Sequence, residues 1–199
     1  MLISRKYLNA CWKMINKLSA KLSEGIGLRL NSSDNEKEIY AYSIEILISL
    51  LINFIILSIT AYILKKQVEL IVFIVFFSSL RSYAGGYHAK THIECITLSF
   101  CLFVISAISS TYFIEYGKTI LFLGIIFSII MVFVFAPTES ENKPLSKKKF
   151  KKFRLISRIL VIALSLTAIC LYLTKETMGH VYITAAVAMS FESISLLKH

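Results

Sequence analysis

The feature that most constrains this fold is a series of long apolar runs separated by short polar segments. Six runs are apparent, at residues 39–64, 68–80, 96–114, 119–136, 155–173 and 179–197. A helix needs about 20 residues to cross a bilayer, so five of the runs are long enough. The second is short unless its helix continues through Arg81 towards Gly85 and Gly86. The pattern predicts an all-α polytopic membrane protein with about six transmembrane helices in residues 36–199.

An amphipathic segment precedes these runs. Between residues 4 and 30, lysines alternate with apolar residues that are spaced three and four apart: Leu8, Cys11, Trp12, Ile15, Leu18, Leu22 and Ile26. We therefore expect residues 1–35 to form an interfacial N-terminal segment whose helix lies among lipid headgroups or packs on the rest of the protein. Charge throughout the segment argues against a removable signal peptide. Polar residues 31–35 offer N-caps for the next helix.

Lysine and arginine are divided unequally between the two sides of the predicted spans. With six spans, eighteen lie on the side of the termini: seven before the first span, two in residues 81–95, eight in residues 137–158 and one in the tail. Only Lys65, Lys66, Lys118 and Lys175 lie on the other side. Cytoplasmic flanks carry the excess. Both termini, the polar segment 81–95 and the basic loop 137–154 are therefore predicted to face the cytoplasm.

The net charge and the cysteine spacing indicate which partners the chain can bind and whether it forms disulfides. The net charge of +10 lies beside the spans, which favours anionic lipid headgroups or an acidic peptide over nucleic acid. The four cysteines, Cys11, Cys95, Cys101 and Cys170, show no paired spacing, so no disulfide framework is expected. A reducing cytoplasm suits a free thiol at Cys95.

The polar segment 81–95 contains the candidate catalytic residues. Cys95 needs a base to attack a carbonyl as a thiolate, and His88 or His92 could serve. On one straight helix His88 would lie about 10 Å from Cys95, so a direct hydrogen bond requires a helix break or a helix that begins after His88. His92, three residues before Cys95, would be its helical neighbour. Arg81 could fix the segment at the interface, bind a peptide carboxylate, favour the thiolate electrostatically, or simply snorkel at the end of a span. Gly85 and Gly86 could let the substrate backbone approach closely or simply end the second span.

A metal site is the alternative for the same residues. His88, His92 and Cys95 are spaced at i, i+4 and i+7, which could assemble a zinc site on a continuous helix. The sequence offers no obvious fourth ligand beyond Glu94 or water. Cys101 and Cys170 are expected to be small core residues.

Two motifs resemble one known family. Arg81, Gly86, His88 and Cys95, in the order G-x-H-A-K-T-x-x-x-C from Gly86, resemble the active-site region of the AgrB family, the accessory gene regulator peptidases of Gram-positive quorum sensing. Residues 136–145, followed by lysines, resemble that family's loop after the fourth span. The resemblance covers nearly the whole chain in length, span number and order.

The resemblance implies a cytoplasmic-face cysteine endopeptidase. Such an enzyme removes the acidic C-terminal tail of an AgrD-like propeptide and holds the remainder as an acyl-enzyme thioester, which an internal cysteine or serine attacks to close a thiolactone or lactone. Cys95 would be the nucleophile and His88 the general base, with His92 in a minor role and a bend near residues 89–91. The resemblance implies no cofactor or metal, and a homodimer.

The basic run, Lys147, Lys148, Lys149, Lys151 and Lys152, has two compatible interpretations. It could hold the loop in the cytoplasm and contact anionic lipid, or it could bind the acidic tail of the propeptide. Pro137 and Pro144 should stiffen this loop. Within the predicted spans, Glu45 and Glu192 are carboxylates that could pair with Arg81 or line a polar path.

Two other functions remain compatible with the sequence. A small multispan peptide transporter or exporter would use the polar segment as a gate, although no internal repeat favours it. A metal-dependent membrane hydrolase would use His88, His92 and Cys95.

Overall fold

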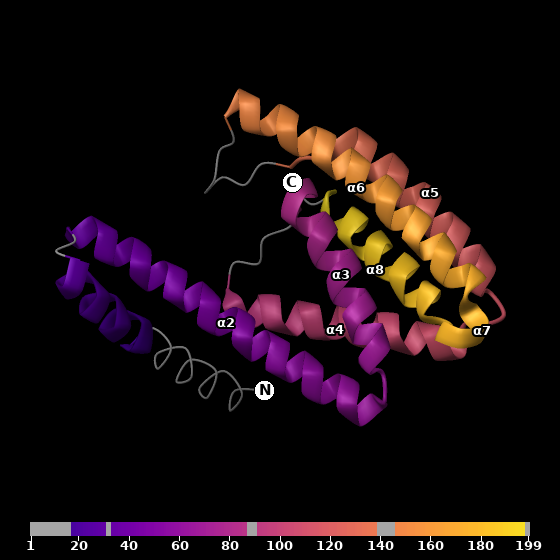
Figure 1. Ribbon diagram of the computed structural model, residues 1–199, viewed down its shortest axis with the longest axis horizontal. Coiled ribbons are helices and arrows are strands. Elements are labelled where there is room, and N and C mark those ends of the chain that lie inside the picture. Colours follow the sequence, from indigo (N-terminus) through magenta and orange to yellow (C-terminus); the bar gives the residue numbers. More distant parts are fainter. Residues whose placement is uncertain (1–16, 31–32, 87–90, 139–145, 198–199) are drawn as a thin grey trace. The chain divides into compact units, whose positions relative to one another are not determined.

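The described part of the chain is helical (Figure 1). The computed structural model describes residues 17–30, 33–86, 91–138 and 146–197, without the side chain of His92. Within the described residues, 17–30 are helical, and the elements that follow are α2 (Asp34–Leu64), α3 (Gln67–Ala84), α4 (His92–Tyr112), α5 (Gly117–Phe135), α6 (Lys147–Leu173), α7 (Lys175–Met178) and α8 (Val181–Ser195).

The predicted all-α membrane fold is confirmed, with a difference in the spans. Five helices, α2 to α6, are long and apolar enough to cross a membrane. The second apolar run does continue through Arg81, giving α3 its 18 residues. The last run forms α8, which has only 15 residues and is shorter than a bilayer-crossing helix requires. A count of six spans is therefore not established.

The chain folds into two compact units. The first comprises residues 1–56 with 90–97, and the second comprises residues 57–89 with 98–199. In the first unit, α2 begins with a local cap: the Glu36 carboxylate accepts hydrogen bonds from the Ser33 N–H at 2.8 Å and from its hydroxyl at 3.0 Å. A glutamate in the first turn that accepts a hydrogen bond from the N–H of the capping residue forms one half of a capping box. Ser33 is thus the cap among the polar residues 31–35.

The helix at residues 17–30 runs beside the start of α2 (Figure 1). Its buried face consists of small residues, Ser19, Ser23 and Gly27, and a Cβ on Gly27 would lie within 2.6 Å of the Lys37 side chain. The apolar residues Leu18, Leu22 and Ile26 are exposed. Small side chains let two helices approach closely, while the exposed apolar stripe is free to contact lipid.

Helix α8 occupies the centre of the second unit. It packs against α3, α5 and α6 (Figure 1), and most of its side chains are buried. Helix α5 approaches it through two glycines: a Cβ on Gly117 would crowd Tyr182 and Ile183, and one on Gly124 would lie 3.2 Å from the Ala186 carbonyl oxygen. Small residues at such contacts are typical of helix packing in membranes. Helix α8 is therefore a core helix, not a lipid-facing span.

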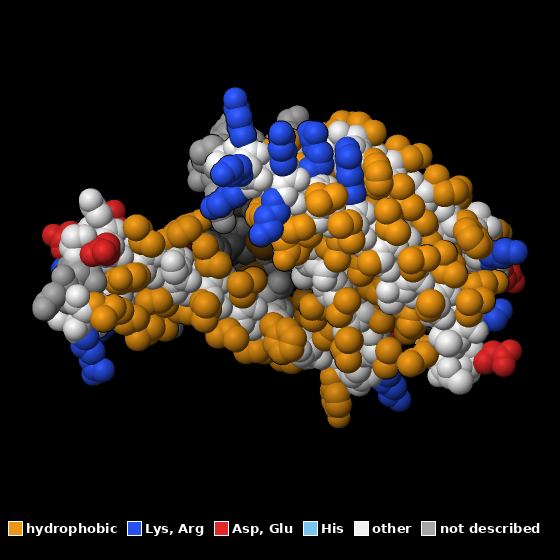
Figure 2. Space-filling view, turned by 45° about the horizontal axis from the view of Figure 1, so that its top comes forward, with side chains coloured by type: hydrophobic (Ala, Val, Ile, Leu, Met, Phe, Trp, Pro, Cys, Tyr) orange, Lys and Arg blue, Asp and Glu red, His pale blue; other side chains and the backbone are white. Residues whose placement is uncertain are grey.

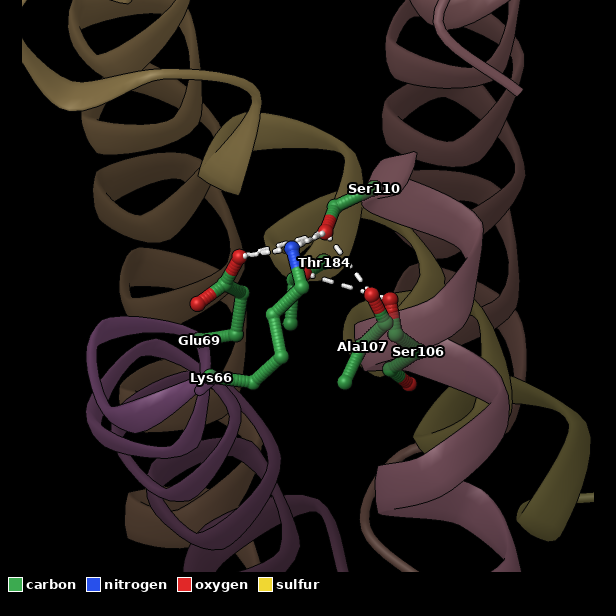
Figure 3. Close-up of polar contacts among 6 residues, drawn as sticks. All are labelled: Lys66, Glu69, Ser106, Ala107, Ser110 and Thr184. Atoms are coloured by element: carbon green, nitrogen blue, oxygen red, sulfur yellow. Dashed lines mark hydrogen bonds and ion pairs between the residues drawn. The ribbon is translucent and has the colours of Figure 1, made fainter. Parts of the chain in front are cut away.

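A polar cluster joins α3 to α4 inside the second unit (Figure 3). Lys66 Nζ, before the first turn of α3, lies 2.6 Å from Glu69 Oε1 and donates to Ser110 Oγ of α4 at 3.2 Å. The Glu69 side chain is 12% exposed. On α8, Thr184 Oγ1 donates to the carbonyl oxygen of Ser106 at 3.2 Å. These contacts tie three helices together where the surrounding surface is apolar.

Replacing only one partner of the Lys66–Glu69 ion pair should destabilise the protein. Lys66→Met leaves the Glu69 carboxylate buried without its cation, and the loss should be about 3 kcal/mol, the lower end for a broken buried pair. The double variant Lys66→Met/Glu69→Leu should recover most of it. Unfolding in detergent, followed by helical circular dichroism, measures both. A double variant as unstable as the single one would contradict an ion-pair role.

Candidate functional site

The candidate nucleophile lies in the first turn of α4. The helix begins at His92, and the Thr91 side chain caps it by accepting a hydrogen bond from the Glu94 N–H at 3.2 Å. The Cys95 N–H donates to the Thr91 carbonyl oxygen at 3.1 Å, and the Cys95 side chain is exposed. The first turn of a helix favours negative charge, which is the form a thiol needs to attack a carbonyl.

The helix break required by the His88 assignment is present. Helix α3 ends at Ala84 and α4 begins at His92, so no continuous helix carries both His88 and Cys95. The N–H groups of Glu94 and Cys95 are both bonded to Thr91. Both N–H groups are therefore used in the helix start and are not available as oxyanion donors in this structure.

The two candidate bases stay predictions. Residues 87–90, including His88, and the side chain of His92 lie outside the described residues. Among the side chains that the structure does describe, no group of three His, Cys, Asp or Glu could hold a metal ion. The alternative zinc site depends on both histidines and is not decided by these side chains. Cys95, Cys101 and Cys170 are free thiols, and the last two are exposed on their helices, not buried as expected.

Arg81 pairs with a carboxylate from the other end of the sequence. Its Nη1 lies 3.2 Å from Oε2 of Glu192 on α8. The Glu192 side chain is fully buried, whereas that of Arg81 is 25% exposed. The guanidinium also lies 5.6 Å from the centre of the Phe77 ring. A buried carboxylate is costly unless it is paired, so this ion pair fixes the end of α3 to the end of α8.

The two glycines after Arg81 lie against different elements. Gly85 (φ +81°) faces Thr138, whose N–H donates to the Ala84 carbonyl oxygen at 2.9 Å. Gly86 (φ +120°) is buried against α8, and a Cβ there would overlap Ser195 Oγ and lie 3.0 Å from Glu192 Oε1. Both the positive φ angles and the close contacts require glycine. The two sequence motifs, around Arg81 and around Pro137, thus meet at the ends of α3 and α8.

The basic run opens α6 at the same end of the second unit. Ser146 caps α6, and the lysines of the run are exposed. The rings of Tyr83 on α3 and Phe153 on α6 meet edge to face at 5.8 Å. Figure 2 shows lysine and arginine side chains gathered over the start of α6, with apolar side chains over most of the remaining helical surface on this face. Arg81 and the basic run thus lie at the same end of the second unit.

A second possible nucleophile pair is not supported by its contacts. Lys66 Nζ lies 3.2 Å from Ser110 Oγ, which resembles a serine and lysine pair (Figure 3). The same nitrogen is the donor of the ion pair to Glu69, and Ser110 Oγ donates to the Ala107 carbonyl oxygen at 2.8 Å. Lys66 therefore acts as a donor in a structural cluster and not as a proton acceptor.

Sequence reasoning missed two contributions to this end of the protein. Ser195 and Thr138 were not singled out, although both contact the glycine pair. A polar residue three positions after Glu192 on a helix was the available signal for Ser195. Thr138 belonged to the second motif, but only the fold shows that it contacts the first.

The fold and this arrangement define a multi-pass helical membrane protein with a polar end built from Arg81, Glu192 and the glycine pair. A family model described as accessory gene regulator B matches residues 13–196. The chain belongs to the AgrB family.

Relatives named as AgrB-like agree with this assignment. One from Clostridium perfringens (strain SM101 / Type A) is 33% identical over 147 residues, covering 70% of this chain and 68% of the relative. One from Clostridium acetobutylicum is 30% identical over 183 residues, covering 89% of this chain and 84% of the relative. No solved structure matches the chain.

Substitution of Gly86 should test the contact with α8. Gly86→Ala should lose more stability than Gly179→Ala, because Gly179 also has a positive φ (67°) but nothing within 4 Å of its Cβ position. Backbone strain alone costs on the order of 1–3 kcal/mol. Adding Ser195→Ala to Gly86→Ala removes the closest atom, Ser195 Oγ, and should recover most of the additional loss, while the backbone strain at residue 86 remains. Equal losses at Gly86 and Gly179, measured by thermal unfolding in detergent, would contradict the close contact.

Proposed function

We propose that this protein is a membrane-embedded cysteine endopeptidase that cleaves the C-terminal tail from an AgrD-like quorum-sensing propeptide and promotes closure of a thiolactone or lactone. Membership of the AgrB family supports the propeptide as the substrate class. The observation that carries the catalytic assignment is the exposed thiol of Cys95 in the first turn of a capped helix. The active site faces the cytoplasm in this proposal, as do both termini.

The chemistry divides into two acyl transfers. His88 takes the proton from Cys95 Sγ, and the thiolate attacks the carbonyl carbon of the scissile peptide bond. The C–N bond breaks, His88 returns the proton to the leaving amine, and the peptide remains on Cys95 as a thioester. A thiol or hydroxyl within the bound peptide then attacks the thioester carbonyl. The ring closes, and the proton of the attacking group passes to Cys95, so no water is consumed.

Cleavage of the propeptide tests these roles directly. The purified protein, in liposomes with its cognate propeptide, should release the C-terminal tail and carry a covalent acyl group on Cys95 that mass spectrometry detects. Cys95→Ala and His88→Ala should lose at least a hundredfold in rate, within the usual contribution of a general base. His92→Ala should remain near normal.

The same variants separate the competing assignments. Continued cleavage by Cys95→Ala would refute the nucleophile. Loss of activity in His92→Ala with normal His88→Ala would transfer the role of base to the helical neighbour. Cys101→Ala is the matched control, because Cys101 is another exposed thiol on α4. Inactivation by a chelator, reversed by zinc, would favour the metal-dependent hydrolase.

The basic run is proposed to bind the acidic tail of the propeptide. Its five lysines are exposed and lie within the first two turns of α6, where the helix already presents its positive end. The first turn of α6 contains no acidic residue. An acidic peptide segment would therefore reduce the repulsion among these cations as it binds. Anionic headgroups supply the same charge, and the two ligands can alternate at this surface.

Charge reversal distinguishes tail binding from a general electrostatic effect. Lys148→Glu/Lys151→Glu should raise KM for the propeptide about tenfold or more, the size of one to two lost ion contacts, with little change in kcat. Lys118→Glu/Lys175→Glu, which changes the same charge outside the basic run, is the control. The effect should shrink in high salt because exposed charges are screened. An equal KM increase for a propeptide with a neutral tail would contradict the proposal.

A further inference from the structure

The buried end of α8 carries polar groups that the proposed chemistry does not use. Glu192 Oε2 pairs with Arg81, and Ser195 supplies a further polar contact to the same carboxylate. Glu192 Oε1 and Ser195 Oγ are both buried. A carboxylate is retained in such a place only where its contacts offset the cost of burying it.

Both atoms face one backbone position. A Cβ on Gly86 would meet Ser195 Oγ and Glu192 Oε1 before any other atom. Gly86 is buried, with a backbone that side chains rarely adopt, and it precedes His88 by two residues in the sequence. The same carboxylate thus holds Arg81 with one oxygen and faces Gly86 with the other.

We propose that Glu192 is a positioning residue of the peptidase, which holds Arg81 and fixes the backbone of Gly86, two residues before the proposed base in the sequence. This inference rests on the proposed function. Three contacts converge on the same turn: the Glu192 ion pair from α8, the Thr138 N–H bonded to the Ala84 carbonyl oxygen, and the Gly85 N–H bonded to the Arg81 carbonyl oxygen at 3.2 Å. Of these, only the Glu192 contact brings a buried charge.

Glu192 contacts the end of α3 and not the thiol in this assignment. Its loss should therefore slow the reaction without weakening the binding of substrate. Glu192→Gln preserves the shape and removes the charge, and it should lower kcat about tenfold or more with KM within twofold, as expected for misplacement of a catalytic group. Ser193→Ala is the matched control, because Ser193 is also buried on α8 but donates to the Met189 carbonyl oxygen of its own helix at 2.8 Å.

A double-mutant cycle with Arg81 separates positioning from stability. If Glu192 acts through Arg81, Arg81→Gln/Glu192→Gln should be no slower than Arg81→Gln alone. The double variant leaves no unpaired buried charge, so we expect it to fold even if Glu192→Gln does not. Its kcat can then still be compared with that of Arg81→Gln. Additive losses in kcat, or a wild-type rate in folded Glu192→Gln, would overturn the proposal.

Hydrogen exchange provides a readout that does not depend on catalysis. In Glu192→Gln, backbone exchange should accelerate in peptides that cover residues 81–86 and remain unchanged in α5. Unchanged hydrogen exchange at residues 81–86 would show that Glu192 does not fix the backbone at Gly86, and would overturn the proposal. If wild-type protein fails to cleave the propeptide, the proposed function falls, whereas the exchange result still decides whether Glu192 fixes this turn.

Discussion

The second unit depends on the packing of α8, a helix that is largely shielded by its neighbours. Its small side chains, Thr184, Ala185, Ala186 and Ala188, are buried, and α5 approaches them through glycines. Lipid tails are as apolar as leucine, so the hydrophobic effect does little to hold helices together in a bilayer. Close backbone approach and a few polar contacts supply the specificity instead. A short helix can occupy this centre because the surrounding helices, and not α8, meet the hydrocarbon.

Helix α3 receives a charged contact at each end. Glu69 in its first turn pairs with Lys66, which also donates to Ser110 of α4 at 3.2 Å, while Arg81 in its last turn pairs with Glu192 of α8. Glu69 and Arg81 are twelve positions apart, which corresponds to about 18 Å of helix. Each pair is satisfied inside the protein, which allows an otherwise apolar helix to carry ionisable residues. The two contacts fix both the rotation and the height of α3.

Much of the fold was available from the sequence because apolar runs report helices directly. All six runs correspond to helices, and the extension of the second run through Arg81 was foreseen as a requirement for spanning. Hydropathy could not tell that the last run faces protein, since buried and lipid-facing helices share an apolar composition. The pairing of Arg81 with Glu192 was one of two options, and only the fold selects it. Contacts of Thr138 and Ser195 with the glycine pair join distant segments, so helical periodicity gives no sign of them. The proposed role of His88 as the base rests on family resemblance, because spacing from Cys95 alone favoured His92.

The pairing of Arg81 with Glu192 has a consequence for how the protein is made. The two residues are 111 positions apart, and the acidic partner lies on α8. A ribosome synthesises α3 well before α8, so Arg81 enters the membrane environment before its counter-ion exists. Until then, the arginine can keep its charge in the headgroup region through its long side chain. The polar end, and the turn at Gly86 that lies on it, can therefore be completed only after α8 has been made.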